Sequence, residues 1–321
     1  MASRESLPQI PGFRLLRKLG EGASGTVYQA IEEEDEREVA LKLFEPFDGP
    51  DVPLPEDIEH ERRVAASLRH RHLARVHAMG AFGGQYWLAS EYLPGGTLAE
   101  RIAKPLPVPR ALEILGDLSR GLAHAHARGV VHGDVKPSNV LFRGVRGKGD
   151  AVLVDFGTAI LMRANQRRAV GGTPGYMSQE QARGEPLDGR ADLFSLGRVL
   201  VDMLAGRPSE PEVGSDGPVE GVTLPVQTLP VSARWLQPLV DALTAEQRED
   251  RPADARAVLS MLATLVEASP EANRVLPPTP SATALPRIHG VPEATRPRLW
   301  PWLVLGLLVL VAAFWSQLAP G

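Results

Sequence analysis

The sequence contains no cysteine, which excludes disulfide bonds and thiolate metal ligands and is compatible with a reducing compartment. It also lacks an excess of positive charge. The formal net charge is −4 over 321 residues, so the composition gives no indication of a nucleic-acid partner. The first eight residues are polar and lack the apolar core of a signal peptide. We therefore expect the N-terminal part to stay in the cytoplasm, where it is synthesised.

One long apolar run lies near the C-terminal end. Residues 299–318 contain no charged side chain, and about 20 apolar residues in a helix cross a hydrocarbon core of roughly 30 Å. Arg296 and Arg298 precede this run, which favours a cytoplasmic location for everything before it. The alternative is a buried core helix, which a run so long and uniformly apolar disfavours. The sequence thus predicts a single-pass protein of the cell membrane with a short tail at 319–321.

The remaining chain divides into segments of different composition. Residues 267–298 carry seven prolines and few large apolar side chains, which is typical of an extended, flexible linker. Residues 13–92 show short strand patterns with glycine turns, an acidic hairpin tip and one helical pattern at 56–68. Residues 96–266 show mainly helical patterns, notably at 109–128, 190–204, 232–243 and 252–265. Residues 1–12 form a polar tail. This order predicts an α+β fold in which a small β-rich lobe precedes a larger helical lobe.

Within the first lobe, a glycine-rich segment reads Gly-Glu-Gly-Ala-Ser-Gly from Gly20 to Gly25. A dinucleotide-binding fingerprint has the same glycine spacing, but it needs a helix after the glycines. Residues 27–30 read instead as a strand, so a glycine hairpin lying over phosphates fits better. Lys42 on the next strand is then placed to contact nucleotide phosphates, with Glu61 on the intervening helical pattern as its partner.

The most informative residues follow the main helical pattern of the second lobe. Phosphoryl transfer needs a carboxylate for the attacking hydroxyl, oxygen ligands for Mg²⁺, and positive charge near the transferred group. Asp134 supplies the first of these and Lys136 supplies the positive charge, while Asn139 and Asp155 supply the metal ligands. Scattered Asp and Asn residues usually belong to turns, but this ordered set predicts a phosphotransfer site.

These segments together resemble the eukaryotic-type protein kinase family, and in particular its bacterial serine/threonine branch. The resemblance covers about residues 13–265. The stretch 172–180 is similar to the family's substrate-docking segment ending in Ala-Pro-Glu, and residues 192–197 are similar to its buried helix. The resemblance implies two lobes and a Mg²⁺- and ATP-dependent kinase acting on Ser/Thr hydroxyls of proteins, with Mn²⁺ as a substitute metal.

The resemblance also implies roles for individual residues. The catalytic set is Asp134, Lys136, Lys42 and Glu61, and the metal set is Asn139 and Asp155. Thr173, Glu180, Asp192 and Arg251 have structural or substrate-docking roles: Asp192 braces the catalytic loop, and Arg251 pairs with Glu180. Alignment with the family's hinge places the Glu91 carbonyl and the Leu93 N–H against adenine, Ala40 and Leu141 on its faces, and Ser90 at the space behind it. The ATP-binding set is Leu19, Gly20, Gly22, Gly25, Val27, Ala40, Lys42, Glu91, Leu93 and Leu141.

Two departures from the family pattern bear on regulation. Gly133 replaces the arginine that usually precedes the catalytic aspartate, and Ser178-Gln179-Glu180 replaces Ala-Pro-Glu. Residues 159–172 also contain no Ser, Thr or Tyr, so the sequence predicts an enzyme that is active without loop phosphorylation. Membrane confinement should allow self-association and trans-autophosphorylation of linker hydroxyls, although the linker could instead be only a spacer. The candidate sites are Thr279, Ser281, Thr283 and Thr295.

Other functions fit the residues less well. Small-molecule phosphotransferases also place His-Gly-Asp before a catalytic loop, but they lack the Lys136–Pro137 pair and the 172–180 stretch. A pseudokinase scaffold usually lacks at least one of Lys42, Asp134 and Asp155, all of which are present. The numerous histidines follow no compact spacing that would hold a metal.

Overall fold

The computed structural model describes residues 7–22, 25–45, 63–145, 149–156, 172–207 and 228–275. Residues 1–275 form one compact unit, and residues 276–321 form a second unit that lies outside the described residues. The predicted membrane span at 299–318 therefore stays a prediction. No helix among the described residues is long and apolar enough to cross a membrane.

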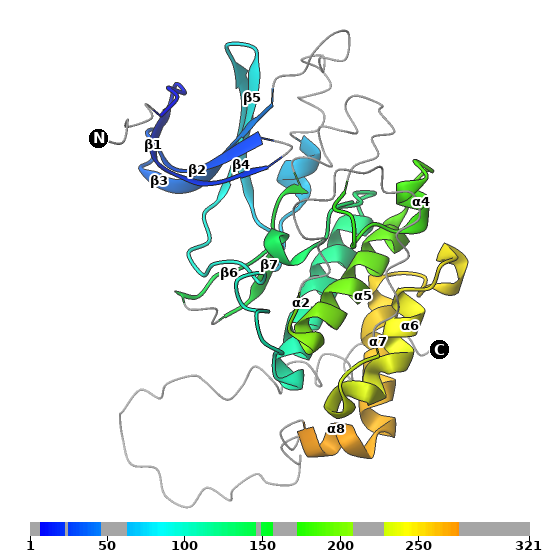
Figure 1. Cartoon of the computed structure of the whole chain (residues 1–321). Coiled ribbons are helices and arrows are strands. Elements are labelled where there is room, and N and C mark those ends of the chain that lie inside the picture. The colour runs from blue at the N-terminus through cyan, green and yellow to red at the C-terminus, as the bar shows by residue number, and fades with distance from the viewer. Residues whose placement is uncertain are drawn as a thin grey trace, which may run out of the picture. The chain divides into compact units, whose positions relative to one another are not determined.

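The first lobe is a five-stranded antiparallel sheet with the strand order β1-β2-β3-β5-β4 (Figure 1). Its core is formed by side chains from one face, including Val39, Leu41 and Ala89, none of which is exposed. This arrangement confirms the predicted β-rich lobe. The strands are β1 Phe13–Gly22, β2 Gly25–Glu32, β3 Arg37–Phe44, β4 Val76–Phe82 and β5 Gln85–Glu91.

The glycine-rich segment joins β1 to β2, and the acidic run forms the turn between β2 and β3. Strand β2 thus follows the glycines directly, which agrees with the phosphate-covering hairpin and not with a dinucleotide fingerprint. The turn is exposed, as a solvated tip should be. The predicted helix at 56–68 is described only in part, because residues 63–67 are helical and the rest lies outside the described residues.

The second lobe is built mainly from helices that pack side by side (Figure 1). Helix α5 is its centre: it presents buried residues all round, as expected for a helix surrounded by other elements. It begins at the N-cap Asp188 and ends at Gly206, whose φ of 73° is the left-handed conformation that favours glycine. The longer elements of this lobe are α2 Val108–His126, α4 Gln179–Ala182, α5 Gly189–Ala205, α6 Gln237–Leu243, α7 Ala255–Ala268 and α8 Pro270–Val275.

Three short 3-10 helices and a two-stranded sheet complete the described part of the lobe. The strands β6 Val140–Phe142 and β7 Ala151–Leu153 pair antiparallel and follow the predicted catalytic segment. The 3-10 helices are η2 Pro137–Asn139, η4 Val231–Leu236 and η5 Arg248–Asp250.

Two sequence expectations need correction. The pattern at 232–243 predicts one helix, but its first half is the 3-10 helix η4 and only the second half is α6. Helix α8 lies within the stretch 267–298 that the composition assigns to a flexible linker. Ala272 of α8 is completely buried, so packing of this short helix supplies the stability that a proline-rich composition lacks.

A short segment joins the two lobes near the site. Residues 70–74 run alongside β7, where Leu73 forms a bridge with Leu153 and the Ala74 N–H donates to the Leu153 carbonyl at 2.9 Å. The buried His72 ring contacts the Ala151 carbonyl through Nδ1 at 3.0 Å. These contacts fix the first sheet relative to the segment that carries Asp155.

Candidate active site

The predicted catalytic carboxylate lies within a small polar cluster. Asp134 Oδ1 accepts a hydrogen bond from the Thr173 hydroxyl at 2.8 Å, and Lys136 Nζ lies 2.9 Å from Asp134 Oδ2. Lys136 Nζ also donates to Thr173 Oγ1 at 2.6 Å. The structure therefore brings together three residues that the sequence assigns to catalysis and docking.

Electrostatics keep this carboxylate ionised. Burial pushes the pKa of Asp134 upward, but the Lys136 ammonium and hydrogen bonds from Lys136 and Thr173 outweigh burial, so its pKa is lowered. Asn139 adds to the cluster, since its Nδ2 donates to the Asp134 carbonyl at 2.8 Å and to Oδ2 at 3.1 Å. The carboxylate is thus held in one orientation from several sides.

Lys42 of β3 reaches the Asp155 carboxylate from the other lobe. Its Nζ lies 2.7 Å from both Asp155 oxygens, and its side chain is buried. Asp155 has a φ of 70°, in the left-handed region that non-glycine residues seldom adopt. The predicted partner Glu61 lies outside the described residues. The ion pair observed is therefore Lys42–Asp155.

A buried aspartate organises the backbone before the catalytic carboxylate. Asp192, at the start of α5, accepts hydrogen bonds from the backbone N–H groups of His132 and Gly133, each at 2.8 Å. His126 Nε2 lies 2.7 Å from the same carboxylate. Burial opposes ionisation of Asp192, but these donors and nearby His132 lower its pKa. This matches the bracing role expected of Asp192 and adds His126, which sequence reasoning missed.

The predicted ion pair between Glu180 and Arg251 is present and buried. Arg251 Nη1 and Nη2 donate to the two Glu180 oxygens at 2.6 and 3.0 Å. Burial raises the pKa of Glu180, but the Arg251 hydrogen bond leads the effects that reverse this, and the net pKa is lowered. Glu180 thus fulfils its expected structural role although Ser178 and Gln179 replace Ala and Pro.

Several of the predicted ATP-binding residues of the first lobe are paired on neighbouring strands. Gly20 pairs with Val27, and Val27 in turn pairs with Lys42. At Gly20 and Gly22 an added Cβ would meet no described atom within 4 Å, so this hairpin leaves open space. Gly25 differs, because a Cβ there would lie 2.0 Å from the Leu43 carbonyl oxygen. The close approach of β3 therefore requires glycine at position 25.

The residues predicted to surround adenine lie where β5 leaves the sheet. Ala40 pairs with Ser90 across β3 and β5, and Leu141 packs with Leu93 in one hydrophobic cluster. Leu19 in β1 is exposed. The Glu91 side chain forms an ion pair with Arg143. The backbone carbonyl of Glu91 is therefore the group predicted to contact adenine.

The residues predicted to hold a divalent metal have suitable chemistry. Asn139 uses its amide nitrogen for Asp134, so its amide oxygen remains as a hard ligand, and Asp155 supplies a carboxylate. Oxygen ligands of this kind fit Mg²⁺ or Mn²⁺. Elsewhere in the described residues, no group of three or more His, Cys, Asp or Glu side chains could hold a metal ion.

A comparison with models of protein families agrees with the arrangement of these site residues. The protein kinase domain family matches residues 13–261, which is most of the chain. The chain belongs to this family. Its kinase domain is similar in structure to the kinase domain of PknI from Mycobacterium tuberculosis, with a TM-score of 0.64 and 27% identity. That likeness covers 81% of this chain and 97% of the PknI chain.

Curated relatives are bacterial serine/threonine-protein kinases. PknJ of Mycobacterium tuberculosis is 35% identical over 61% of this chain, and pkn2 of Myxococcus xanthus is 32% identical over 82%. The matches span about a third of each relative, 34% of PknJ and 33% of pkn2.

Gln181 is a site residue that sequence reasoning missed. Its side chain is buried, and its Nε2 donates to the Gly133 carbonyl, one residue before Asp134. A Cβ added to Gly172 would lie 2.5 Å from this same nitrogen. Gly133 has a φ of 73°. The glycine at 172 therefore makes room for Gln181 beside the catalytic segment, whereas the left-handed backbone at position 133 favours glycine there. The missing arginine at 133 is the signal in the sequence that points to this difference from the family.

We expect Gln181→Leu to lower kcat about fivefold while leaving the KM for ATP unchanged. The substitution keeps the volume but removes a hydrogen bond worth about 1 kcal/mol, which frees the backbone that precedes Asp134. Steady-state kinetics on a peptide substrate measure kcat and the KM for ATP. A thermal melt measures the effect of the lost hydrogen bond on stability. Gln179→Leu on the same helix is the control, because Gln179 Oε1 is buried without a hydrogen-bond partner in the described structure. A wild-type kcat for Gln181→Leu would contradict the assignment.

Ser90 should control the space behind adenine. Its side chain is small and half-buried, so ATP-competitive inhibitors with bulky substituents should inhibit the wild type. Ser90→Met should weaken that inhibition at least about tenfold, because overpacking of a formed site commonly costs 1–3 kcal/mol. Inhibition curves at matched ATP saturation measure this, with exposed Ser232→Met as the control. Equal inhibition of wild type and Ser90→Met would show that the hinge alignment is wrong.

Proposed function

We propose that this chain is a Mg²⁺- and ATP-dependent serine/threonine protein kinase, anchored in the cell membrane by one span with its kinase domain in the cytoplasm. The observation that carries the catalytic part is the Asp134–Thr173–Lys136 cluster. A threonine hydroxyl already donates to the proposed base at 2.8 Å and accepts from a lysine ammonium at 2.6 Å. An acceptor Ser or Thr hydroxyl has the same hydrogen-bonding chemistry as Thr173.

In the proposed reaction, Asp134 orients the acceptor hydroxyl and takes its proton as the oxygen attacks the γ-phosphorus of ATP. The bond to the β–γ bridging oxygen breaks, ADP leaves, and the proton on Asp134 passes to solvent. Lys136 offsets negative charge on the transferred group, and Lys42 contacts the phosphates that remain on ADP. Mg²⁺ held by Asn139 and Asp155 would neutralise charge on the phosphates.

Incubation with radiolabelled ATP, Mg²⁺ and a basic protein tests the catalytic proposal. Phosphoserine or phosphothreonine in the acceptor, lost when Mg²⁺ is chelated, is the expected result. Label found only in small molecules would indicate a small-molecule phosphotransferase. ATP binding without transfer would indicate a pseudokinase scaffold.

The membrane part of the proposal rests on the sequence of residues 299–318 and on Arg296 and Arg298 before them. Fractionation of cells tests it. The full chain should stay with membranes after a carbonate wash, whereas a chain ending at residue 298 should be soluble. Recovery of the full chain in the soluble fraction would refute the anchor.

We further expect phosphatase treatment to leave the initial rate on an exogenous substrate unchanged. Gly133 provides no arginine to pair with a phosphorylated loop residue, and a phosphate on Thr173 would oppose the Asp134 carboxylate. Phosphosite mapping should place autophosphorylation in the linker, at residues such as Thr279 or Thr295. A rate that falls on treatment and recovers together with phosphate on Thr158 or Thr173 would contradict this.

A further inference from the structure

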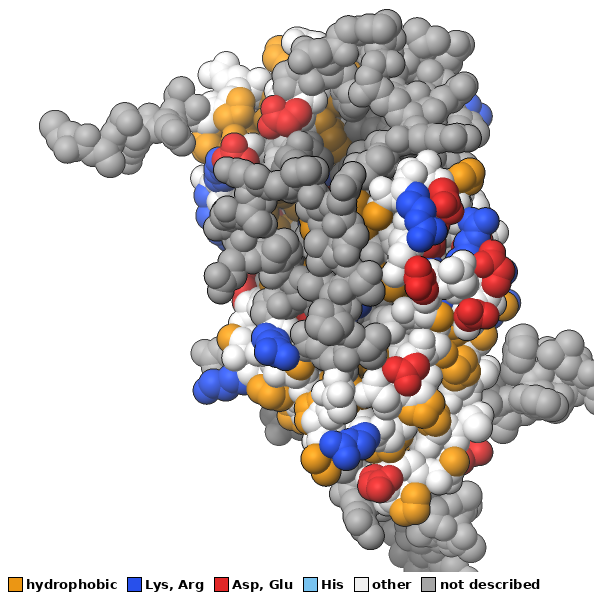
Figure 2. All heavy atoms as spheres, turned by 45° about the vertical axis from the view of Figure 1, so that its right-hand side comes forward, with side chains coloured by type: hydrophobic (Ala, Val, Ile, Leu, Met, Phe, Trp, Pro, Cys, Tyr) orange, Lys and Arg blue, Asp and Glu red, His pale blue; other side chains and the backbone are white. Residues whose placement is uncertain are grey.

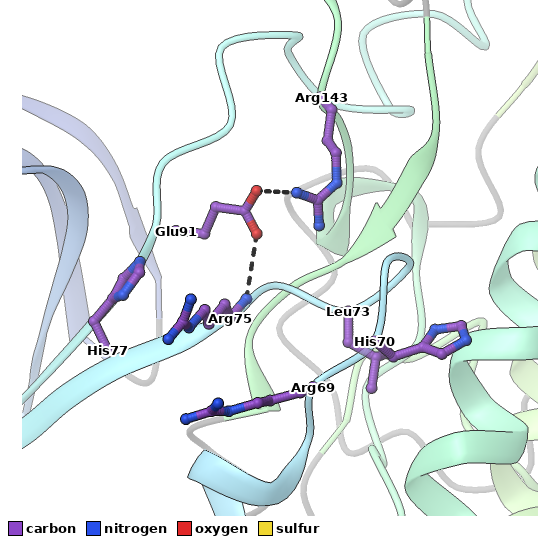
Figure 3. Close-up of a pocket in the computed structure, with 7 residues that line it drawn as sticks. All are labelled: Arg69, His70, Leu73, Arg75, His77, Glu91 and Arg143. Carbon is purple, nitrogen blue, oxygen red and sulfur yellow. Dashed lines mark hydrogen bonds and ion pairs between the residues drawn. The ribbon is translucent and has the colours of Figure 1, made fainter.

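A cavity of about 390 Å³ lies away from the catalytic cluster, where the two lobes join (Figure 3). Its walls come from the 69–75 connection, from β4, from the end of β5 and from the residue after β6. None of the proposed catalytic or metal-holding residues lines it. The lining residues are Arg69, His70, Leu73, Arg75, His77, Glu91 and Arg143.

The lining carries an excess of cationic groups. Glu91 is its one carboxylate, and Glu91 is already engaged by the Arg143 guanidinium and by the Arg75 backbone N–H at 3.4 Å. Arg69 donates to the Ala66 carbonyl at 3.3 Å. Within the described part of the chain, neither Arg69 nor Arg75 has a carboxylate partner. Figure 3 shows both side chains extending in the same direction from the 69–75 connection.

Two histidines, His70 and His77, also line the first cavity. Burial is the main reason that the pKa of His70 falls to about 4, followed by the effects of His72, His124, Arg120 and Arg71. Burial also lowers the pKa of His77, followed by the effects of Arg37 and Arg75. Both rings are therefore neutral at pH 7, when each can still donate one N–H to an anion.

A second cavity of about 350 Å³ shares His70 with the first and continues between α2 and α7. Arg120, Arg128 and Arg256 line it together with His124. Arg120 is paired with Asp117, whereas Arg128 and Arg256 have no carboxylate partner among the described residues. On the face that Figure 2 presents, by contrast, acidic and basic side chains are interspersed.

From this geometry we infer that the two cavities form a docking site for a phosphorylated, acidic segment of a protein substrate. The phosphoryl group binds between Arg69 and Arg75, and acidic residues beside it contact Arg128 and Arg256. Guanidinium groups suit this ligand because they bind phosphate oxygens with paired N–H donors. The inference rests on the proposed kinase function, which supplies phosphoserine and phosphothreonine in the substrates themselves. Such a site would hold a substrate after a first phosphorylation and favour a second.

Other polyanions fit the cavities less well. A membrane-binding surface combines basic residues with exposed apolar side chains, whereas Leu73, the apolar residue of the first cavity, is buried. Single-stranded nucleic acid is held largely by stacking on aromatic rings, and the first lining contains no Phe, Tyr or Trp. A concave site of this size suits one phosphorylated side chain and its neighbours.

Fluorescence anisotropy with the full chain tests the inference. The probe is a labelled peptide with one phosphothreonine between glutamates, compared with the same peptide carrying threonine. We expect the phosphopeptide to bind at least about tenfold more tightly, and the double variant Arg69→Gln/Arg75→Gln to lose at least about tenfold in affinity, since hydrogen bonds to charged groups are the stronger class. Arg207→Gln/Arg234→Gln is the matched control, because both side chains are exposed and the charge change is the same.

Equal binding of the two peptides, or equal phosphopeptide binding by wild type and Arg69→Gln/Arg75→Gln, would overturn the inference. Glycerophosphoserine, a phosphatidylserine headgroup without acyl chains, provides a second arm, because it does not depend on residues 299–318. If the double variant loses binding of glycerophosphoserine but not of the phosphopeptide, the site recognises lipid headgroups and the inference is wrong. The binding assay needs no turnover, and the double variant should phosphorylate a short unphosphorylated peptide at the wild-type rate. Failure of docking is therefore distinguishable from failure of the proposed kinase function.

Discussion

Replacing Asp134 by asparagine is expected to lower kcat at least about a hundredfold while the domain stays folded. A positioned base commonly contributes 10²–10⁴-fold, and the amide of asparagine cannot accept the proton of the attacking hydroxyl. The substitution also places a neutral group against Lys136 and Thr173, both of which donate to the carboxylate. Both consequences act on the chemical step, so the KM for ATP should change little.

Initial rates with a protein substrate and a thermal melt measure these effects separately. Asp241→Asn is the matched control, because Asp241 is exposed and accepts a hydrogen bond from Gln237 within its own helix. A residual rate above about a hundredth of wild type in Asp134→Asn would argue against its role as the base, given the contribution usual for such a group.

The sequence predicts the sheet lobe well because its signals are local. Alternating patterns and glycine turns specify β1, β2 and β3, and the acidic run can form only a solvated turn between strands. Helices α2 and α5 likewise follow from apolar periodicity, within a few residues at each end. Each of these elements can be predicted because the side-chain pattern that specifies it lies entirely within its own segment of the sequence.

Expectations failed where tertiary packing decided the structure. A helical pattern cannot distinguish the 3-10 geometry of η4 from an α-helix, because both place apolar residues on one face. A proline-rich composition suggests a linker, yet α8 forms because Ala272 packs into the domain. The boundary of the compact unit at residue 275 therefore could not be predicted from composition.

Motifs predict which residues come together in the site, but they do not predict all of the residues that position these side chains. The Asp134, Lys136 and Thr173 cluster and the Glu180–Arg251 pair follow from family motifs. The Gln181 contact does not, since its side chain reaches a carbonyl 48 residues earlier in the chain. The same holds for His126 and Asp192, which lie 66 residues apart. Such contacts depend on the packing of α2, α4 and α5 around the catalytic segment.

Lys42→Met and Asp155→Asn should each reduce kcat/KM at least about a hundredfold, because each removes charge that acts on the phosphates. The double variant should be no less active than the weaker of the two single variants. Lys42 Nζ contacts both Asp155 oxygens at 2.7 Å, so the two side chains act as one unit and their effects should not multiply.

Stability should separate the two single variants. Lys42 is 6% exposed, so Asp155→Asn leaves a buried ammonium without its Asp155 partner, and breaking a buried pair commonly costs 3–5 kcal/mol of unfolding free energy. The Asp155 side chain is 26% exposed, so Lys42→Met leaves a carboxylate that water can reach and should cost less. Adding Lys42→Met to Asp155→Asn removes the buried ammonium whose Asp155 partner is gone and should restore part of the lost stability.

Urea unfolding of the single and double variants measures this coupling. Asp150→Asn is the matched control, because the Arg71–Asp150 pair is substantially exposed and such pairs contribute at most about 1 kcal/mol. If the double variant loses, relative to wild type, the sum of the unfolding free energies lost by the two single variants, Lys42 and Asp155 act independently. The ion pair would then have no part in holding the phosphate-binding lysine in place.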